Sequence, residues 1–257
     1  MPGDGRTPQL DALRGLAVLW MVAFHFSFDL NWLGFIRPPF NFYTDPIWTL
    51  QRVAIVSLFL LCSGAAVALG DATQRGAGRF WRRWAQIAGS AALVSLGSWA
   101  IFPGSWISFG VLHAVAAMLL IQRGLRAVLL RWGGPAGRAL AAQPLLWLAL
   151  AAAVLALWLG VQHPWFDTRW TNPLGLVTHK PITEDYVPLA PWLAPFFIGY
   201  ACAQALQRRP GWVRQLRHCP AGPAGLRWLG SHTLSIYLLH QPLLLGGLWA
   251  LRHWVGV

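Results

Sequence analysis

Charged residues are scarce in this 257-residue sequence. They make up 11% of the chain, whereas a soluble globular domain carries about 25%. Acidic residues are scarcer still, with 8 Asp and Glu against 20 Lys and Arg, which gives a formal net charge of +12. Apolar residues account for 56% of the chain, and the mean hydropathy is +0.48. This composition predicts a membrane-embedded protein. In such a protein the excess of positive charge indicates which loops face the cytoplasm, and it does not by itself indicate nucleic-acid binding.

Cysteine is also rare, and the sequence has little that would divide it into parts. The three cysteines are unevenly spaced, and Cys62 and Cys202 lie inside apolar runs, so we expect no disulfide framework, metal site or redox chemistry. Internal repeats, low-complexity tracts and long linkers are lacking, so we expect one domain over residues 1–257. Because no A-x-A cleavage site follows the first apolar run, we interpret that run as a retained anchor.

Long apolar runs are abundant. A membrane-spanning helix needs about 20 apolar residues, so seven spans would use roughly 140 residues. The remaining residues, about 117, must form the loops and termini, which leaves no room for a soluble domain. We predict an all-α integral membrane protein, a bundle of about seven transmembrane helices. The last span could instead be two shorter helices broken near Pro242, because proline removes a backbone donor. The predicted spans are residues 10–30, 48–70, 84–102, 106–128, 144–161, 188–206 and 226–251.

Arginine is concentrated in every second connection between the predicted spans. Residues 71–83, 123–143 and 207–227 hold thirteen arginines, whereas the alternate connections hold only three basic residues, Arg37, Arg169 and Lys180. The positive-inside rule therefore predicts a cytoplasmic N-terminus and an outer C-terminus. The thirteen arginines are Arg75, Arg79, Arg82, Arg83, Arg123, Arg126, Arg131, Arg138, Arg208, Arg209, Arg214, Arg217 and Arg227.

The first predicted span contains four ionisable residues, and each is a candidate functional residue because charge inside a bilayer is costly. Arg14 and His25 are eleven residues apart, which on an α-helix is about 20° of net rotation and about 16.5 Å of rise. Asp11 precedes Arg14 by three positions and Asp29 follows His25 by four, spacings at which helical side chains meet. The pattern indicates an acid–base pair near each end of the helix.

Structural alternatives stay open for each of these residues. His25 could be a polar side chain satisfied by a helix neighbour, and Arg14 could extend to the lipid headgroups. Asp11 could do no more than balance Arg14.

Two further histidines, His113 and His240, lie in apolar segments at depths that we expect to approach that of His25. A lone intramembrane histidine often makes an interhelical hydrogen bond, but three at similar depth indicate a shared polar cavity. Arg52, about one turn below the outer surface, could pair with Asp45 or Asp29, or extend to the headgroups.

The segment RFWRRW, from Arg79 to Trp84, mixes basic and aromatic residues. It could set the topology and contact anionic lipids, with tryptophan at the interface. Alternatively, Arg79, Arg82 and Arg83 could bind an anionic ligand, because guanidinium groups match phosphate geometry.

The segment LDALRGLAVLWMVAFH resembles the first-helix signature of the membrane acyltransferase superfamily, an arginine and a histidine separated by ten residues. The whole chain resembles bacterial relatives of the heparan-α-glucosaminide N-acetyltransferase catalytic domain. The segments that carry this resemblance are SLFLLCSGAAVAL (57–69), FGVLH (109–113), YVPLAPWLAPFFIGYA (186–201) and LRWLGSHTLSIYLLHQP (226–242).

This resemblance implies acyl transfer across a membrane, with acyl-CoA, most simply acetyl-CoA, bound from the cytoplasmic side and a glycan or other acceptor on the outer face. It implies donor binding by Arg14 with some of Arg79, Arg82 and Arg83. The sequence departs from the family at one point. The lysosomal members carry a catalytic histidine in their first lumenal loop, whereas the nearest segment here, TDPIW from Thr44 to Trp48, contains no histidine. By the pattern of the broader acyltransferase superfamily, the resemblance then implies His25 as the base.

We expect Asp29 to orient His25 and Arg52 to contact the acceptor. We expect His113 and His240 to bind the acceptor or to stabilise the negative charge that develops on it. The rival interpretation is a small proton-coupled transporter that uses the same intramembrane His and Asp residues. An inverted repeat or paired broken helices would favour the transporter, and the sequence shows neither. We expect the protein in a bacterial inner membrane, in contact with its lipids.

Overall fold

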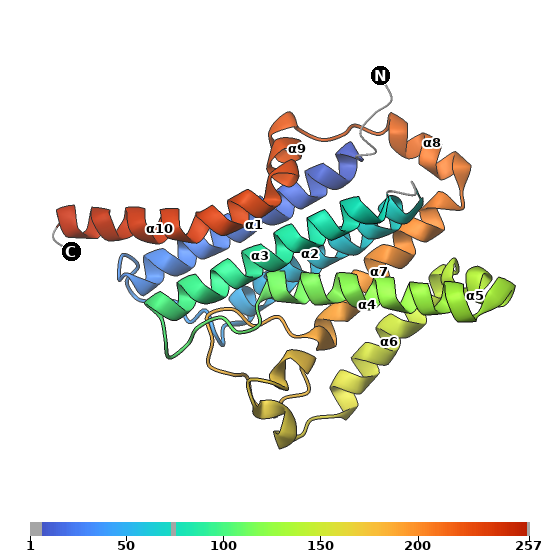
Figure 1. The fold of residues 1–257 in the computed structure, drawn as a ribbon. Helices are drawn as coiled ribbons and strands as arrows, with labels where there is room; N and C mark the ends of the chain where they lie inside the picture. The colour runs from blue at the N-terminus through green and yellow to red at the C-terminus, as the bar shows by residue number, and fades with distance from the viewer. Residues whose placement is uncertain (1–6, 73–75, 256–257) are drawn as a thin grey trace. The chain divides into compact units, whose positions relative to one another are not determined.

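The structure is a computed structural model that describes residues 7–72 and 76–255 (Figure 1). Over these residues every named element is helical, which confirms the predicted all-α fold class. Arg75, one of the thirteen arginines, lies outside the described residues. The helices are α1 (Pro8–Trp32), α2 (Pro46–Ala72), α3 (Ala77–Ile101), α4 (Val111–Trp132), α5 (Gly134–Ala141), α6 (Pro144–Gly160), η1 (Pro164–Asp167), η2 (Asn172–Leu174), α7 (Leu189–Gln207), α8 (Pro210–His218), α9 (Ala224–Ser231) and α10 (Thr233–Val255).

Within the described residues, five helices are long and apolar enough to cross a membrane: α1, α2, α4, α7 and α10. A sixth span is possible if α5 and α6, which meet at a bend of 72°, count as one broken span. Helix α3 has the length of a span, but Gln86 and several serines and glycines dilute its apolar content. The predicted number of about seven spans is therefore not confirmed: α3 is not among the candidates, and α6 counts only as part of the bent pair.

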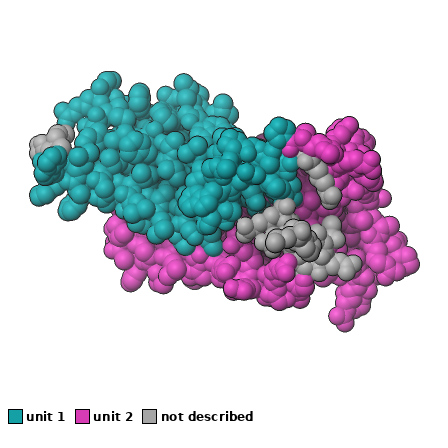
Figure 2. All heavy atoms as spheres, turned by 90° about the horizontal axis from the view of Figure 1, so that it is seen from above, with its two compact units in different colours: residues 1–59, 220–257 teal, residues 60–219 magenta. Residues whose placement is uncertain are grey.

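The chain forms two compact units, which Figure 2 shows in different colours. Unit 1 consists of residues 1–59 and 220–257, and unit 2 consists of residues 60–219. The boundary falls inside α2, so unit 1 contains α1, the first part of α2, α9 and α10. Unit 2 contains the rest of α2 and the elements from α3 to α8.

In unit 1, glycines let the backbones of α1 and α9 touch. A Cβ atom added to Gly15 would lie 1.8 Å from the carbonyl oxygen of Leu226, and one added to Gly230 would lie 1.7 Å from that of Asp11. Small residues permit this kind of close approach between membrane helices. Because α10 also packs against α1, the two glycines help to set how the C-terminal helices meet the helix that carries His25.

The C-terminal apolar run is divided at His232 into α9 and α10. The backbone of His232 is not helical there, and the hydroxyl of Thr233 donates to the carbonyl of Gly230 at 2.7 Å. Pro242 lies inside α10. Membrane helices tolerate an internal proline when neighbouring groups bond to the backbone carbonyl that loses its usual N–H donor. The prediction of one helix over 226–251 is therefore wrong, and so is the alternative of a break near Pro242.

Two glycines make the same kind of contact in unit 2, between α2 and α7. A Cβ atom on Gly64 would lie 1.9 Å from the carbonyl oxygen of Phe196, and one on Gly199 would lie 2.0 Å from that of Leu61. Helix α7 also packs closely on α6, where Trp147 and Phe197 are buried together. The core of unit 2 thus forms around α7.

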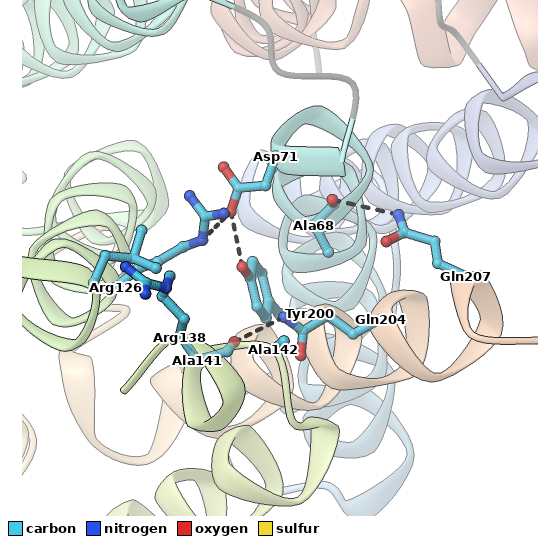
Figure 3. Close-up of a pocket in the computed structure, with 10 residues that line it drawn as sticks. Ala68, Asp71, Arg126, Arg138, Ala141, Ala142, Tyr200, Gln204 and Gln207 are labelled. Carbon is cyan, nitrogen blue, oxygen red and sulfur yellow. Dashed lines mark hydrogen bonds and ion pairs between the residues drawn. The ribbon is translucent and has the colours of Figure 1, made fainter. Parts of the chain in front are cut away.

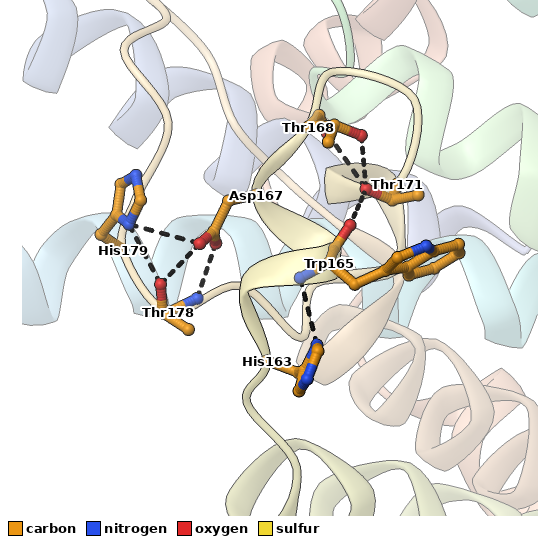
Figure 4. A network of polar contacts seen from close by, with 7 residues as sticks. All are labelled: His163, Trp165, Asp167, Thr168, Thr171, Thr178 and His179. Atoms are coloured by element: carbon orange, nitrogen blue, oxygen red, sulfur yellow. Dashed lines mark hydrogen bonds and ion pairs between the residues drawn. The ribbon is translucent and has the colours of Figure 1, made fainter.

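The loop between α6 and α7 is held by its own hydrogen bonds (Figure 4). The hydroxyl and the backbone N–H of Thr178 both donate to Asp167, at 2.6 and 2.8 Å, and the hydroxyl bond holds the pKa of the Asp167 carboxyl below its ordinary value. His179 lies 3.5 Å from the same carboxyl, and His163 accepts from the backbone of Trp165 at 3.1 Å. These two histidines therefore serve the structure of the loop.

Candidate active site

Two of the three predicted intramembrane histidines lie together in unit 1. His25 on α1 and His240 on α10 have ring centroids 5.0 Å apart, in an edge-to-face arrangement. The side chain of His240 is buried, whereas that of His25 is partly exposed. Helical periodicity within α1 cannot specify this pair, because it depends on how α10 packs along α1.

The hydrogen bonding of His240 determines which of its ring nitrogens carries the proton. Its Nδ1 lies 2.7 Å from the carbonyl oxygen of Tyr237. A carbonyl oxygen only accepts, so Nδ1 must be the donor and a neutral ring has its lone pair on Nε2. That Nε2 atom is buried and has no hydrogen-bond partner among the described residues.

Asp29 is almost fully buried one turn beyond His25, but its partner is on α10. The side chain of Gln241 donates a hydrogen bond to Asp29, and within the described residues none joins Asp29 to His25. The expectation that Asp29 orients His25 therefore has no direct contact behind it in this structure. Both residues lie on α1 at the predicted spacing, but packing against α10 directs the carboxyl toward Gln241.

Three buried acceptor atoms at this level of unit 1 lack hydrogen-bond donors among the described residues. They are Nε2 of His240, Oδ2 of Asp29 and Oε1 of Gln241. Buried polar atoms are nearly always hydrogen-bonded in folded proteins, so each unsatisfied atom calls for an explanation. All three are acceptors, and a hydroxyl- or amino-bearing ligand would supply donors for the two on Asp29 and Gln241.

The other end of α1 carries the ion pair that the sequence predicts. Nη1 of Arg14 lies 3.2 Å from Oδ1 of Asp11, and the Asp11 residue is buried. The pair is formed across three positions of the same helix, as the spacing indicated. Arg14 is thus held near the N-terminal end of α1, on the helix that also carries His25.

His113 occupies a different position from the one we expected. It is the third residue of α4, so it lies at a helix start instead of deep within a helix. Its Nδ1 accepts from the N–H of Gly110 at 3.3 Å, and its Nε2 lies 3.1 Å from the hydroxyl of Ser95, which donates to the carbonyl of Ile107. The expected depth was wrong because α4 begins at Val111 and not near residue 106. Both ring nitrogens therefore have partners: Nδ1 caps the start of α4 at Gly110, and Nε2 links α4 to Ser95 on α3.

The remaining basic candidates are spread over both units. Arg79, Arg82 and Arg83 lie on the exposed first turns of α3. Near them, the guanidinium of Arg123 lies 4.2 Å from the ring centre of Phe80. Arg52 is partly buried on α2, and among the described residues it forms no ion pair with Asp45 or Asp29, contrary to one of the predicted alternatives.

Unit 2 holds a pocket of about 440 Å³ that is open to solvent (Figure 3). Asp71 organises its polar wall, because its carboxyl accepts from the hydroxyl of Tyr200 at 2.8 Å and lies 3.6 Å from Nε of Arg126. Arg138 also lines the pocket, as does Gln204, which donates to the carbonyl of Ala141 at 3.1 Å. Two guanidinium groups and one carboxylate give this wall a net positive charge.

Sequence reasoning missed these residues although a signal was present. Asp71 ends a long apolar run and Tyr200 lies within another, so the cost of burying polar groups in a membrane would have selected both. Gln241 follows a predicted site histidine directly.

The structure shows no candidate metal site in residues 7–72 and 76–255. Nowhere in these residues do three or more His, Cys, Asp or Glu side chains come together in a way that could hold a metal ion.

No curated protein and no solved structure matches the chain. Residues 6–242 match the family described as "Heparan-alpha-glucosaminide N-acetyltransferase, catalytic", which confirms the resemblance and favours a membrane acetyltransferase over a transporter. The apolar helices agree with an integral membrane protein. Because the match covers most of its length, this chain belongs to the heparan-α-glucosaminide N-acetyltransferase catalytic family.

Proposed function

We propose that this protein transfers an acyl group, most simply acetyl, from cytoplasmic acyl-CoA to a glycan or other acceptor on the outer face of a bacterial inner membrane. The acceptor binds beside His25 in unit 1, and His25 is the general base. The observation that carries this proposal is the pair of unsatisfied acceptor atoms on Asp29 and Gln241, at the level of the neighbouring rings of His25 and His240. A hydroxyl or amino group would supply the donors that these atoms lack.

In the proposed reaction, a nitrogen of His25 takes the proton from the acceptor's O–H or N–H group. The acceptor oxygen or nitrogen then forms a bond to the thioester carbonyl carbon, and the carbon–sulfur bond breaks. The proton held by His25 passes to the departing sulfur, so that free CoA and the acylated acceptor are the products. This is general acid–base catalysis by one imidazole. His113 and Arg52 remain proposed acceptor-binding residues.

Binding of the donor requires cationic side chains that match its phosphates. Arg14 is the proposed anchor on α1, with contributions from Arg79, Arg82 and Arg83 at the exposed start of α3. Guanidinium groups form charge-assisted, forked hydrogen bonds with phosphate.

Replacing Arg14 with alanine should raise KM for acyl-CoA about 10- to 150-fold while kcat changes little. A hydrogen bond to a charged group is worth about 1.5–3 kcal/mol, and a phosphate contact far from the reacting carbonyl stabilises ground and transition states alike. Arg14→Lys should recover part of the loss, because lysine keeps the charge but not the fork. Steady-state kinetics over a range of donor concentrations measures both constants.

The control for Arg14 is Leu13→Ala, a neighbouring exposed position on the same helix. An unchanged KM together with a lower kcat in Arg14→Ala would remove Arg14 from donor binding.

The proposed orientation predicts that residues 71–83, 123–143 and 207–227 face the cytoplasm, since their arginines would otherwise have to cross the membrane. Single cysteines at the exposed positions Gly76 and Ala139 would test it after Cys62, Cys202 and Cys219 are replaced. An impermeant maleimide added to intact cells should leave both unlabelled and should label the control I182C, in the loop between α6 and α7. Labelling of the first two from outside would reverse the orientation.

A direct assay separates acyl transfer from transport. Purified protein is incubated with radiolabelled acetyl-CoA and a panel of amino- and hydroxyl-bearing sugars, and free CoA and labelled sugar are measured. Acceptor-dependent release of CoA supports the proposal. Binding of acetyl-CoA without turnover on any acceptor would favour the proton-coupled carrier, which uses the same histidines without a chemical step.

A further inference from the structure

We infer that His240 acts with His25 as a pair: the Nε2 lone pair of His240 accepts the N–H of His25, orients its ring, and stabilises the imidazolium that forms when His25 takes the acceptor's proton. His240 is thus a positioning residue that works through His25. This inference rests on the proposed function and adds to it a residue that takes over the orienting role first expected of Asp29.

The contact between His240 and Tyr237 fixes the tautomer of the His240 ring. The carbonyl of Tyr237 accepts from Nδ1 at 2.7 Å, so the neutral ring can only accept at Nε2. Tyr237 lies three residues earlier on the same helix, which makes this contact part of α10 itself. The lone pair on Nε2 is therefore present before any substrate binds.

The Nε2 lone pair of His240 has no hydrogen-bond partner in the described part of the chain. Nε2 of His240 is buried and unsatisfied among the described residues, while the ring of His25 lies next to it with centroids 5.0 Å apart. Catalytic hydrogen bonds are often long in an unliganded enzyme and shorten when substrate binds. A small movement of either ring would let the unpaired nitrogen accept from His25.

A carboxylate usually orients a catalytic histidine, but Asp29 is not placed to do so. Asp29 accepts from Gln241, and no hydrogen bond to His25 is found in the described part of the chain. A neutral imidazole can orient its partner, but it loses that ability when it is protonated. The transfer reaction should therefore require both histidines in their neutral form.

Few other charged groups surround the pair. Helix α10 packs against α1 and α9, and at this level α1 contributes His25 and Asp29. Arg14 is about 16.5 Å further along α1. The charged residue of α9 is Arg227, and the part of α2 in unit 1 has Arg52, which forms no ion pair with Asp29 in the described residues.

Two substitutions separate the lone pair from the shape of the ring. His240→Phe keeps an aromatic ring without an acceptor and should lower kcat about 10- to 150-fold, the effect of losing one hydrogen bond to a charged group, with little change in either KM. His240→Gln offers an acceptor that does not titrate and should recover part of kcat. The matched control is His253→Phe, at an exposed position near the end of the same helix.

The pH profile gives a readout that a structural role would not move. A plot of log(kcat/KM) against pH, measured with one acceptor throughout, should rise at low pH. Its slope should be one unit steeper in the wild type than in either His240 variant, because each variant lacks one of the two groups that must be neutral. In a His25→Ala background, His240→Phe should cause little further loss, since His240 acts through His25. If His240→Phe does not fold, His240→Gln still decides the slope.

Several results would overturn the inference. They are a wild-type kcat in folded His240→Phe, an unchanged slope in His240→Gln, or a full additional loss in the double variant. Nitrogen-15 NMR of labelled histidine, assigned with His240→Gln, gives a test without catalysis, because a proton on Nε2 of neutral His240 would contradict it. If the wild type transfers no acyl group to any acceptor, the proposed function fails. The NMR measurement does not depend on turnover, so a failure of the histidine pair can be told apart from a failure of the proposed function.

Discussion

Replacement of His25 with alanine is expected to slow acyl transfer by about 10²–10⁴-fold, the usual effect of removing a general base. The side chain of His25 is a partly exposed proton acceptor on α1, next to the buried ring of His240. Donor binding should be nearly unchanged, because the proposed anchor at Arg14 lies about 16.5 Å away along the helix. Turnover is measured as CoA release at saturating donor and acceptor, and donor affinity by calorimetry.

The matched control for His25 is Phe26→Ala, the next residue on α1, whose side chain is exposed. It should retain turnover, since it removes a large side chain at the same level without removing a titrating group. Wild-type turnover in His25→Ala would remove His25 from the mechanism. A loss of donor affinity together with turnover would instead indicate that the substitution disturbs α1 as a whole.

Alanine at Gly64 or Gly199 is expected to destabilise unit 2 by about 1–3 kcal/mol, the typical cost of forcing extra atoms into a packed core. The added methyl groups would lie 1.9 Å and 2.0 Å from the carbonyl oxygens of Phe196 and Leu61. Backbone atoms cannot turn aside as a side chain can, so α2 and α7 must move apart. The effect should appear as a lower midpoint in detergent or thermal unfolding, followed by intrinsic tryptophan fluorescence.

The controls for these glycines lie where a methyl group meets nothing. Gly97 on α3 and Gly246 on α10 have no atoms within 4 Å of an added Cβ, and alanine there should leave the unfolding midpoint unchanged or raise it, because alanine favours a helix. A Gly64→Ala protein as stable as Gly97→Ala would mean that α2 and α7 do not pack as described. The double variant of Gly64 and Gly199 also tests whether the two contacts form one interface, because neighbouring sites should not be additive.

The position of His113 shows why depth along a helix was harder to predict than the helix itself. The apolar run predicted the helix, which the structure confirms from Val111 to Trp132. The start, however, depends on Gly110 and on contacts with residues distant in the chain, such as the carboxyl of Asp185, which accepts from the N–H of Val111 at 2.9 Å. A few residues of error at a helix end moved His113 from the predicted interior to the first turn.

The sequence by itself determined the all-α membrane class, the approximate bounds of most helices, the Asp11–Arg14 pair and the family, because apolar length, helical spacing and motif order are local properties of the chain. Only the tertiary structure decided that the rings of His25 and His240 lie in contact, that Asp29 is hydrogen-bonded to Gln241, and that the last apolar run is divided into two helices at His232. These depend on which helix faces pack together. That packing is governed by backbone contacts between glycines and residues far away in the sequence, such as Gly15 with Leu226, which no spacing within a single helix encodes.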